Sequence, residues 1–286
     1  MQAGKLFLVY FLFSSLCLTS QAQDAPAPYS ALNGNWNLAG GRNSAGKKLF
    51  LSLSIGVSGD SVYGSGFVDV NCSEKGRSHG SSIFLIGQMA PDRTFQLTNS
   101  ARPDVRIQVS IQGTAPSDGE TTWEGSFTIT NSVRLTECTI DLSNDFVASA
   151  YPPLNGTYVG MINGHGLGPG ITISAQITQD AFSFSSLTSS NPTFFALLSS
   201  TISVSGSPCF TKGTSTQGNA TDLITKSLIR GDEIDLRYSM NDGSTLLVVA
   251  WLTDLSESAL KINMARVDGG KCDGAIAMDS GTLTRQ

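Results

Sequence analysis

The pentapeptide Leu32-Asn33-Gly34-Asn35-Trp36 recurs in the second half of the chain as Leu154-Asn155-Gly156-Thr157-Tyr158. Each copy leads through a Gly-rich turn into a stretch in which apolar and polar residues alternate, Leu49–Ile55 in the first half and Ile171–Ile177 in the second. Because successive side chains of a β-strand point to opposite faces, this alternation predicts strands with one buried face. The shared opening and the shared strand indicate one structural unit that occurs twice.

Two segments that end in cysteine continue the repeat in the same order. Gly66–Cys72 in the first half corresponds to Thr201–Cys209 in the second, and Phe127–Cys138 corresponds to Leu260–Cys272. Self-similarity of this kind is the sequence signature of tandem structural units. The match in order and spacing extends the repeat over most of both halves.

Each unit has the length of an independent small domain. We expect one β-domain over residues 32–150 and a second over residues 154–286. Two prolines make residues 151–153 the linker between them. The second unit carries an insertion around Phe182–Ser200.

Residues 1–22 have the features of a secretory signal peptide. A positively charged start is followed by the apolar run Leu6–Thr19 and by the small-residue cleavage site Ser20-Gln21-Ala22. Residues 23–31 then form an extended leader. We therefore expect an exported protein (periplasmic, cell-surface or extracellular) that does not span a membrane after cleavage, because no other run approaches the length of a membrane helix.

Cleavage leaves four cysteines, which in an exported chain predict two disulfides with three arrangements. Pairing between the two units would break the repeat. We therefore expect the disulfides Cys72–Cys138 and Cys209–Cys272.

The periodicity throughout both units is two, as in the stretch Val105–Gln112, and no long amphipathic helix with caps is apparent. Ile234–Met240 and Thr245–Leu252 flank a turn signal and predict a hairpin. Each unit has room for about eight short strands. The fold class is therefore all-β, with two tandem antiparallel domains that are either β-barrels or β-sandwiches.

The segment Gly34-Asn35-Trp36 resembles the Gly-x-Trp that opens the first strand of lipocalins, and with Leu32 it is similar to the start of avidins. That resemblance implies an eight-stranded barrel that binds a small ligand. Tyr158 replaces the tryptophan in the second unit, Thr253-Asp254-Leu255 matches two residues of the lipocalin Thr-Asp-Tyr, and Arg134 and Arg285 are candidates for the late lipocalin arginine. The overall pattern also resembles two-repeat exported β-proteins of environmental bacteria.

Composition and motifs argue against several classes of function. The chain has 18 basic and 23 acidic residues, a net charge of −5 and no basic stripe, so no nucleic-acid partner is expected. A strand follows the Gly-rich segment Gly164–Gly170, which is unlike a phosphate loop. Carboxylates occur together at Asp232-Glu233 and Asp235, but Glu233 and Asp235 alternate with apolar residues and are expected on a solvated face. With His79 and His165 isolated and no Cys-x-x-Cys present, we expect no catalytic residues, no metal and no cofactor.

Four aromatic residues are the candidates for structural or ligand-lining roles. Trp36 and Tyr158 occupy equivalent positions and are expected to close the barrel ends. Trp123 and Trp251 lie on later strands and either pack in the core or line a cavity. The first functional hypothesis is a binding module for a small apolar or amphipathic ligand. The alternative is a non-catalytic structural or interaction protein of the cell envelope, with barrels filled by side chains and outer faces that contact a glycan or a protein.

Overall fold

The computed structural model describes residues 30–42, 48–71, 81–99, 108–130, 142–164, 167–185, 193–206, 208–209, 216–219 and 227–286. The expected signal peptide and most of the leader lie outside the described residues, as do Cys72, Cys138, His79, His165 and Arg134. Within the described part of the chain, none of the helices has the length and hydropathy needed to cross a membrane.

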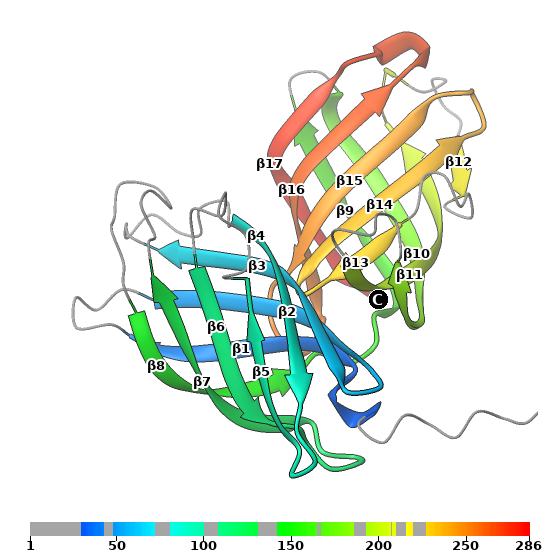
Figure 1. Ribbon diagram of the computed structural model, residues 1–286. Helices are drawn as coiled ribbons and strands as arrows, with labels where there is room; N and C mark the ends of the chain where they lie inside the picture. Colours follow the sequence, from blue (N-terminus) through cyan, green and yellow to red (C-terminus); the bar gives the residue numbers. More distant parts are fainter. Residues whose placement is uncertain are drawn as a thin grey trace, which may run out of the picture.

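The first half of the chain forms a closed antiparallel β-barrel in which each strand pairs with the next and the last pairs with the first (Figure 1). A short 3-10 helix, η1 (Ser30–Leu32), precedes it. The strands are β1 (Gly34–Arg42), β2 (Lys48–Ser58), β3 (Ser61–Asn71), β4 (Ser81–Met89), β5 (Thr94–Thr98), β6 (Gln108–Thr114), β7 (Thr122–Thr130) and β8 (Leu142–Ala150).

The second half forms a sheet of nine strands that also returns on itself, because β10 pairs with both β9 and β11. The short strands β12 and β13 share one position between β11 and β14, so the ring has eight positions, as in the first barrel. The strands are β9 (Asn155–Gly164), β10 (Gly168–Ser185), β11 (Thr193–Ser205), β12 (Thr216–Asn219), β13 (Leu228–Arg230), β14 (Glu233–Met240), β15 (Thr245–Leu252), β16 (Ala259–Asp268) and β17 (Ile276–Arg285).

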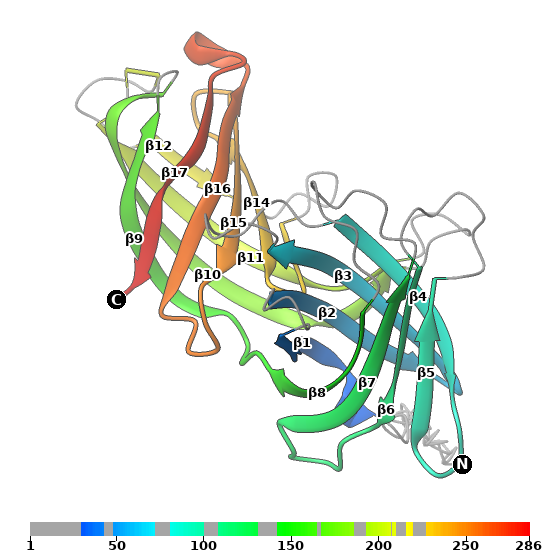
Figure 2. The same cartoon turned by 90° about the vertical axis from the view of Figure 1, so that its left-hand side faces the viewer.

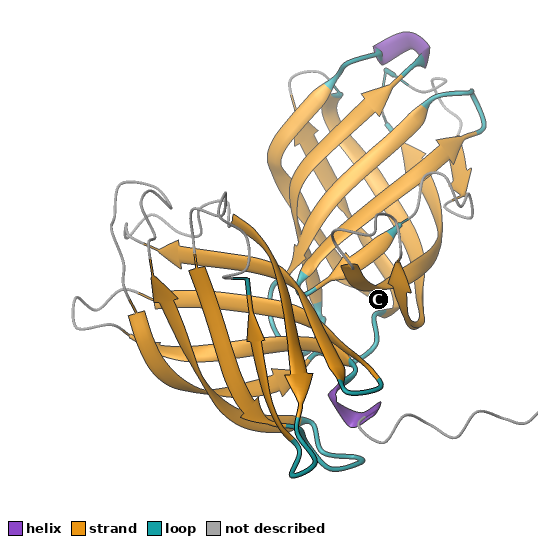
Figure 3. Cartoon of the chain, viewed as in Figure 1, coloured by secondary structure: helices purple, strands orange, loops and turns teal. Residues whose placement is uncertain are grey.

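The prediction of an all-β fold with two tandem antiparallel domains is confirmed, and the domains close as barrels (Figure 3). Strand β2 shows why the sequence folds in this way. Its apolar residues Leu51, Leu53 and Ile55 are buried in the barrel, while Ser52 and Ser54 alternate with them on the outer face. Closure leaves neither barrel with an unpaired edge strand.

The β10–β11 hairpin is longer than its counterpart β2–β3 and contains the insertion found in the sequence. Its pairing continues past a bulge between Gln179 and Phe182. Strand β11 then approaches β2 and β3 of the first barrel, as Figure 2 shows from the side. Part of the insertion therefore belongs to a strand that contacts the first barrel.

Trp36 and Tyr158 occupy matching places in the two barrels. Both side chains are essentially fully buried, and each lies on the first strand of its barrel, Trp36 on β1 and Tyr158 on β9. The Trp36 indole N–H donates a hydrogen bond to the Leu32 carbonyl, 2.9 Å away, and the Tyr158 hydroxyl donates to the Glu257 carbonyl at 3.2 Å. The polar group of each ring thus hydrogen-bonds a segment outside the strands. Buried tryptophan and tyrosine side chains usually have such a partner.

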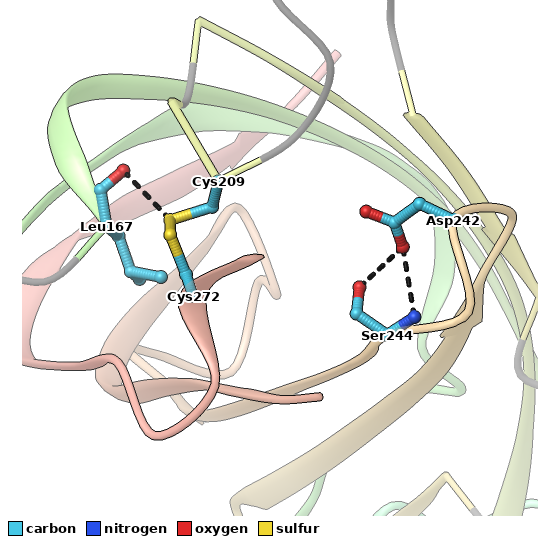
Figure 4. The surroundings of a disulfide bond; sticks show 5 residues. All are labelled: Leu167, Cys209, Asp242, Ser244 and Cys272. Carbon is cyan, nitrogen blue, oxygen red and sulfur yellow. Dashed lines mark hydrogen bonds between the residues drawn. A yellow bond between two sulfur atoms is a disulfide. The ribbon is translucent and has the colours of Figure 1, made fainter. Parts of the chain in front are cut away.

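The disulfide Cys209–Cys272 is present, which confirms one of the two expected pairings. It ties the segment after β11 to the 3-10 helix η2 (Gly270–Cys272), which connects β16 to β17. Figure 4 shows it at the end of the barrel, beside the Leu167 carbonyl and near the turn that Asp242 and Ser244 stabilise. A cross-link over a 63-residue separation stabilises a fold by about 4 kcal/mol in the chain-entropy model.

Candidate functional site

A groove with a volume of about 1220 Å³ runs over the outer face of the first barrel, across β4 to β8. Its most regular feature is a row of polar side chains, with one from each of these five strands. The pairing registers place them opposite one another in the order Gln88, Gln96, Gln112, Ser126 and Asp145. The row crosses the strands at right angles and follows the hydrogen-bonding direction of the sheet.

Three glycines at inward positions lie along this groove. A Cβ on Gly87 would collide with the Gln96 carbonyl, and one on Gly125 would collide with the Gln112 carbonyl. A Cβ on Gly113 would stand 2.6 Å from the Trp123 ring. Any side chain at these points would collide with the neighbouring strand or with Trp123, so glycine allows the strands and the Trp123 ring to pack closely behind the groove.

Trp123 supports the floor of this groove from inside. It is buried and packs edge-to-face against Trp36, Phe95 and Phe146, with ring centroids 6.0, 5.2 and 5.0 Å away. Its indole nitrogen has no hydrogen-bond partner among the described residues. Trp123 is therefore a core residue that lies behind the groove.

The groove surface is suited to hydrogen bonding. The Gln112 side-chain amide donates to Ser126 Oγ at 2.9 Å, and the Gln96 amide donates to Ser110 Oγ at 3.3 Å. Glu124 and Asp145 add carboxylates, and none of the described lining residues is basic. The only large apolar groups strongly exposed here are Ile86 and Val147, each about half exposed.

The tight turn between β13 and β14 docks on the outer face of the first barrel. Ser52 Oγ donates a hydrogen bond to the Asp232 carboxylate, and the Gly231 N–H donates to Ser54 Oγ at 2.8 Å. The Arg230 guanidinium lies 4.5 Å above the Phe67 ring. Ser52, Ser54 and Phe67 point out of their barrel yet are buried, because the second barrel covers them.

The acidic residues of β14 are not on a solvated face, contrary to the sequence interpretation. Burial raises the pKa of both Glu233 and Asp235, with Arg230 acting in the opposite direction. Glu233 pairs with Arg230 at 3.4 Å. Asp232 is almost fully buried. Asp232, through Ser52, and Glu233, through Arg230, therefore belong to the boundary between the barrels.

Trp251 points out of its barrel. Its neighbours Ala250 and Leu252 belong to the apolar interior, whereas Trp251 lines a cleft of about 280 Å³ between the two barrels. Asn37 and Ser52 come to this cleft from the first barrel. The alternation of apolar and polar residues predicts that Trp251 lies on a strand. Nothing in the local sequence indicates that the first barrel packs over that strand.

Arg285, a candidate for the late lipocalin arginine, lies opposite Tyr158 in the β17–β9 pairing and close to Gly156. Beside it, Glu257 is fully buried in the β15–β16 loop and adopts a positive φ of 54°. Neither of its carboxylate oxygens has a hydrogen-bond partner among the described residues. Burial raises the pKa of Glu257 to about 7, against the opposing effect of Arg285.

The described residues contain no group of three or more His, Cys, Asp or Glu side chains arranged to hold a metal ion. No family model, curated protein or solved structure matches the chain significantly.

Proposed function

We propose that this protein is an exported, non-catalytic interaction protein that binds its partner in the outer groove of the first barrel. The observation that carries the proposal is the polar row from Gln88 to Asp145 across five strands. At a strand spacing of about 4.8 Å the row extends for about 19 Å. That length suits an extended partner better than a compact one.

The chemistry of the groove favours a neutral partner rich in hydroxyl groups, such as a cell-envelope glycan. The amides of Gln88, Gln96 and Gln112 both donate and accept hydrogen bonds, and so do sugar hydroxyls. Glu124 and Asp145 accept further hydrogen bonds and disfavour anionic partners.

Packing inside the barrels also favours a binding site on the outer surface over one in the barrel interior. Apolar side chains fill both interiors, with Trp36, Trp123 and Phe127 in the first and Tyr158 and Tyr238 in the second. A small ligand held inside a barrel, as in lipocalins and avidins, would have to displace them. We propose kinship with these families in the barrel design, on the basis of the strand order, the aromatic residue of the first strand and Arg285.

Co-sedimentation with insoluble polysaccharides tests the proposal, with cellulose, chitin and peptidoglycan as the probes. We expect the wild-type protein to bind at least one of them, and the double variant Gln96→Ala/Gln112→Ala to lose most of that binding. Gln176→Ala is the matched control, because Gln176 is also exposed on the outer face of a strand, but in the second barrel. Failure to bind any of the three, or equal binding by the double variant, would refute the proposal.

A further inference from the structure

The cleft between the barrels is separate from the groove, and no residue lines both. Its volume of about 280 Å³ is close to the lower end of the range for small-molecule sites, and such sites favour domain boundaries. Its walls combine the Trp251 indole and the Tyr151 ring with polar groups of both barrels.

Trp251 is held in place by a chain of contacts that crosses the boundary. It stands opposite Glu233 in the β14–β15 pairing, and its side chain hydrogen-bonds the Glu233 carboxyl. Glu233 pairs with Arg230 at 3.4 Å, and Arg230 stacks on Phe67 of the first barrel. The aromatic wall is thus ordered before any ligand arrives, which reduces the entropic cost of binding.

The polar groups of the cleft include donors and acceptors. Lys261 stands opposite Trp251 in the β15–β16 pairing and supplies a donor. Asn37 supplies an amide from the first barrel. Asp254 is an exposed acceptor whose two oxygens also receive hydrogen bonds from Thr253, Ser256 and Ser258, and the bonds from Ser256 lower its pKa and keep it ionised.

We propose that the cleft between the barrels binds a single sugar ring. A pyranose has an apolar C–H face that can lie on an indole and a rim of hydroxyls that both donate and accept hydrogen bonds. The part of Trp251 that lines the cleft, about 8% of its surface, would contact the C–H face, and Asn37, Asp254 and Lys261 fit the rim. This site is independent of the groove and of its partner.

Tryptophan fluorescence provides a selective test, with the methyl glycosides of glucose, galactose and N-acetylglucosamine as the probes. All three tryptophans are largely buried, but Trp36 and Trp123 lie in the core of the first barrel and only Trp251, about 8% exposed, lines the cleft, so a saturable change reports on Trp251. We expect such a change with at least one glycoside, and its loss in Trp251→Phe. Ligand-observed NMR of the same samples then measures affinity in each variant without relying on fluorescence.

Lys261→Ala is expected to weaken binding about tenfold, as the loss of a hydrogen bond from a charged donor implies. Lys271→Ala is the matched control, because Lys271 is also exposed but does not line the cleft, and this variant is expected to bind normally. The groove variant Gln96→Ala/Gln112→Ala is also expected to bind normally, which separates the two proposals. No response to any glycoside, or unchanged affinity in Lys261→Ala, would overturn the assignment.

Discussion

The backbone N–H of Gly231 donates a hydrogen bond to Ser54 Oγ, 2.8 Å away, and so joins a turn of the second barrel to an outward side chain of the first. Ser54 in turn donates to the Asn35 side-chain oxygen at 2.5 Å. All three groups are buried. Because buried polar groups are costly to leave without partners, separating the barrels would require each of them to be rehydrated.

Gly231→Ala should open this boundary. Gly231 has a φ of +63°, and a Cβ there would stand 2.8 Å from Ser52 Oγ and 2.9 Å from the Ser52 backbone. Gly243→Ala is the control, because Gly243 has a φ of +84° but no atom within 4 Å of the added Cβ. We expect Gly231→Ala to lower the free energy of unfolding, measured in urea, by at least about 1 kcal/mol more than Gly243→Ala does, because only Gly231→Ala adds a steric clash. Equal costs would show that the boundary adapts freely.

Truncating the equivalent aromatic residues should affect one barrel at a time. Trp36→Ala and Tyr158→Ala each remove a large buried ring, which typically costs about 3–5 kcal/mol. Hydrogen–deuterium exchange is expected to rise within residues 34–150 for the first variant and within 155–285 for the second. Tyr158→Phe removes only the hydrogen bond to the Glu257 carbonyl and should cost about 1 kcal/mol. Uniform exchange across the chain would contradict independent cores.

Stability should fall as the pH rises through the titration of Glu257. Its pKa is raised from 4.5 to about 7, so the folded protein holds this proton more tightly than the unfolded chain. The destabilisation is therefore absent below about pH 4.5, grows between about pH 4.5 and 7, and is complete above that range. Glu257→Gln should match wild type at about pH 4 and be more stable by about 1–3 kcal/mol at about pH 8.

Urea unfolding at both pH values measures this difference. Glu124→Gln serves as its control, because Glu124 is exposed on β7 and its replacement should have the same small effect at both pH values. If Glu257→Gln is no more stable than wild type at high pH, burial does not destabilise the ionised carboxylate of Glu257.

The disulfides give a further prediction. Peptide mapping without reduction should recover Cys209 linked to Cys272 and Cys72 linked to Cys138. The double variant Cys209→Ser/Cys272→Ser should lose about 4 kcal/mol of stability, because its unfolded chain regains the freedom that the 63-residue loop removes. A linkage between the two halves would be inconsistent with the repeat.

The repeated pentapeptide and the two-residue alternation were sufficient to predict two tandem β-domains, because both are local signals. The groove was not predictable in this way. Gly87, Gly113 and Gly125 are visible in the sequence, but only the strand register shows that Gly113 and Gly125 face each other against Trp123 and that Gly87 packs on the backbone of β5. The burial of Glu233 and the outward direction of Trp251 likewise depend on how one barrel covers the other.

The contact between the barrels joins unlike surfaces, a turn of one and a sheet face of the other, and a heterologous contact of this kind can propagate into a filament. Here the equivalent sheet face of the second barrel and the equivalent turn of the first barrel both lack a residue that makes this contact. In the second barrel Gln176 takes the place that Ser54 has in the first. In the first barrel, the corresponding turn between β4 and β5 spans residues 90–93, contains Pro91, and has Arg93 rather than a glycine at its positive-φ position. The hydrogen bonds that join the two barrels therefore have no equivalent at either end, and we expect the pair of barrels not to add further copies through the same contact.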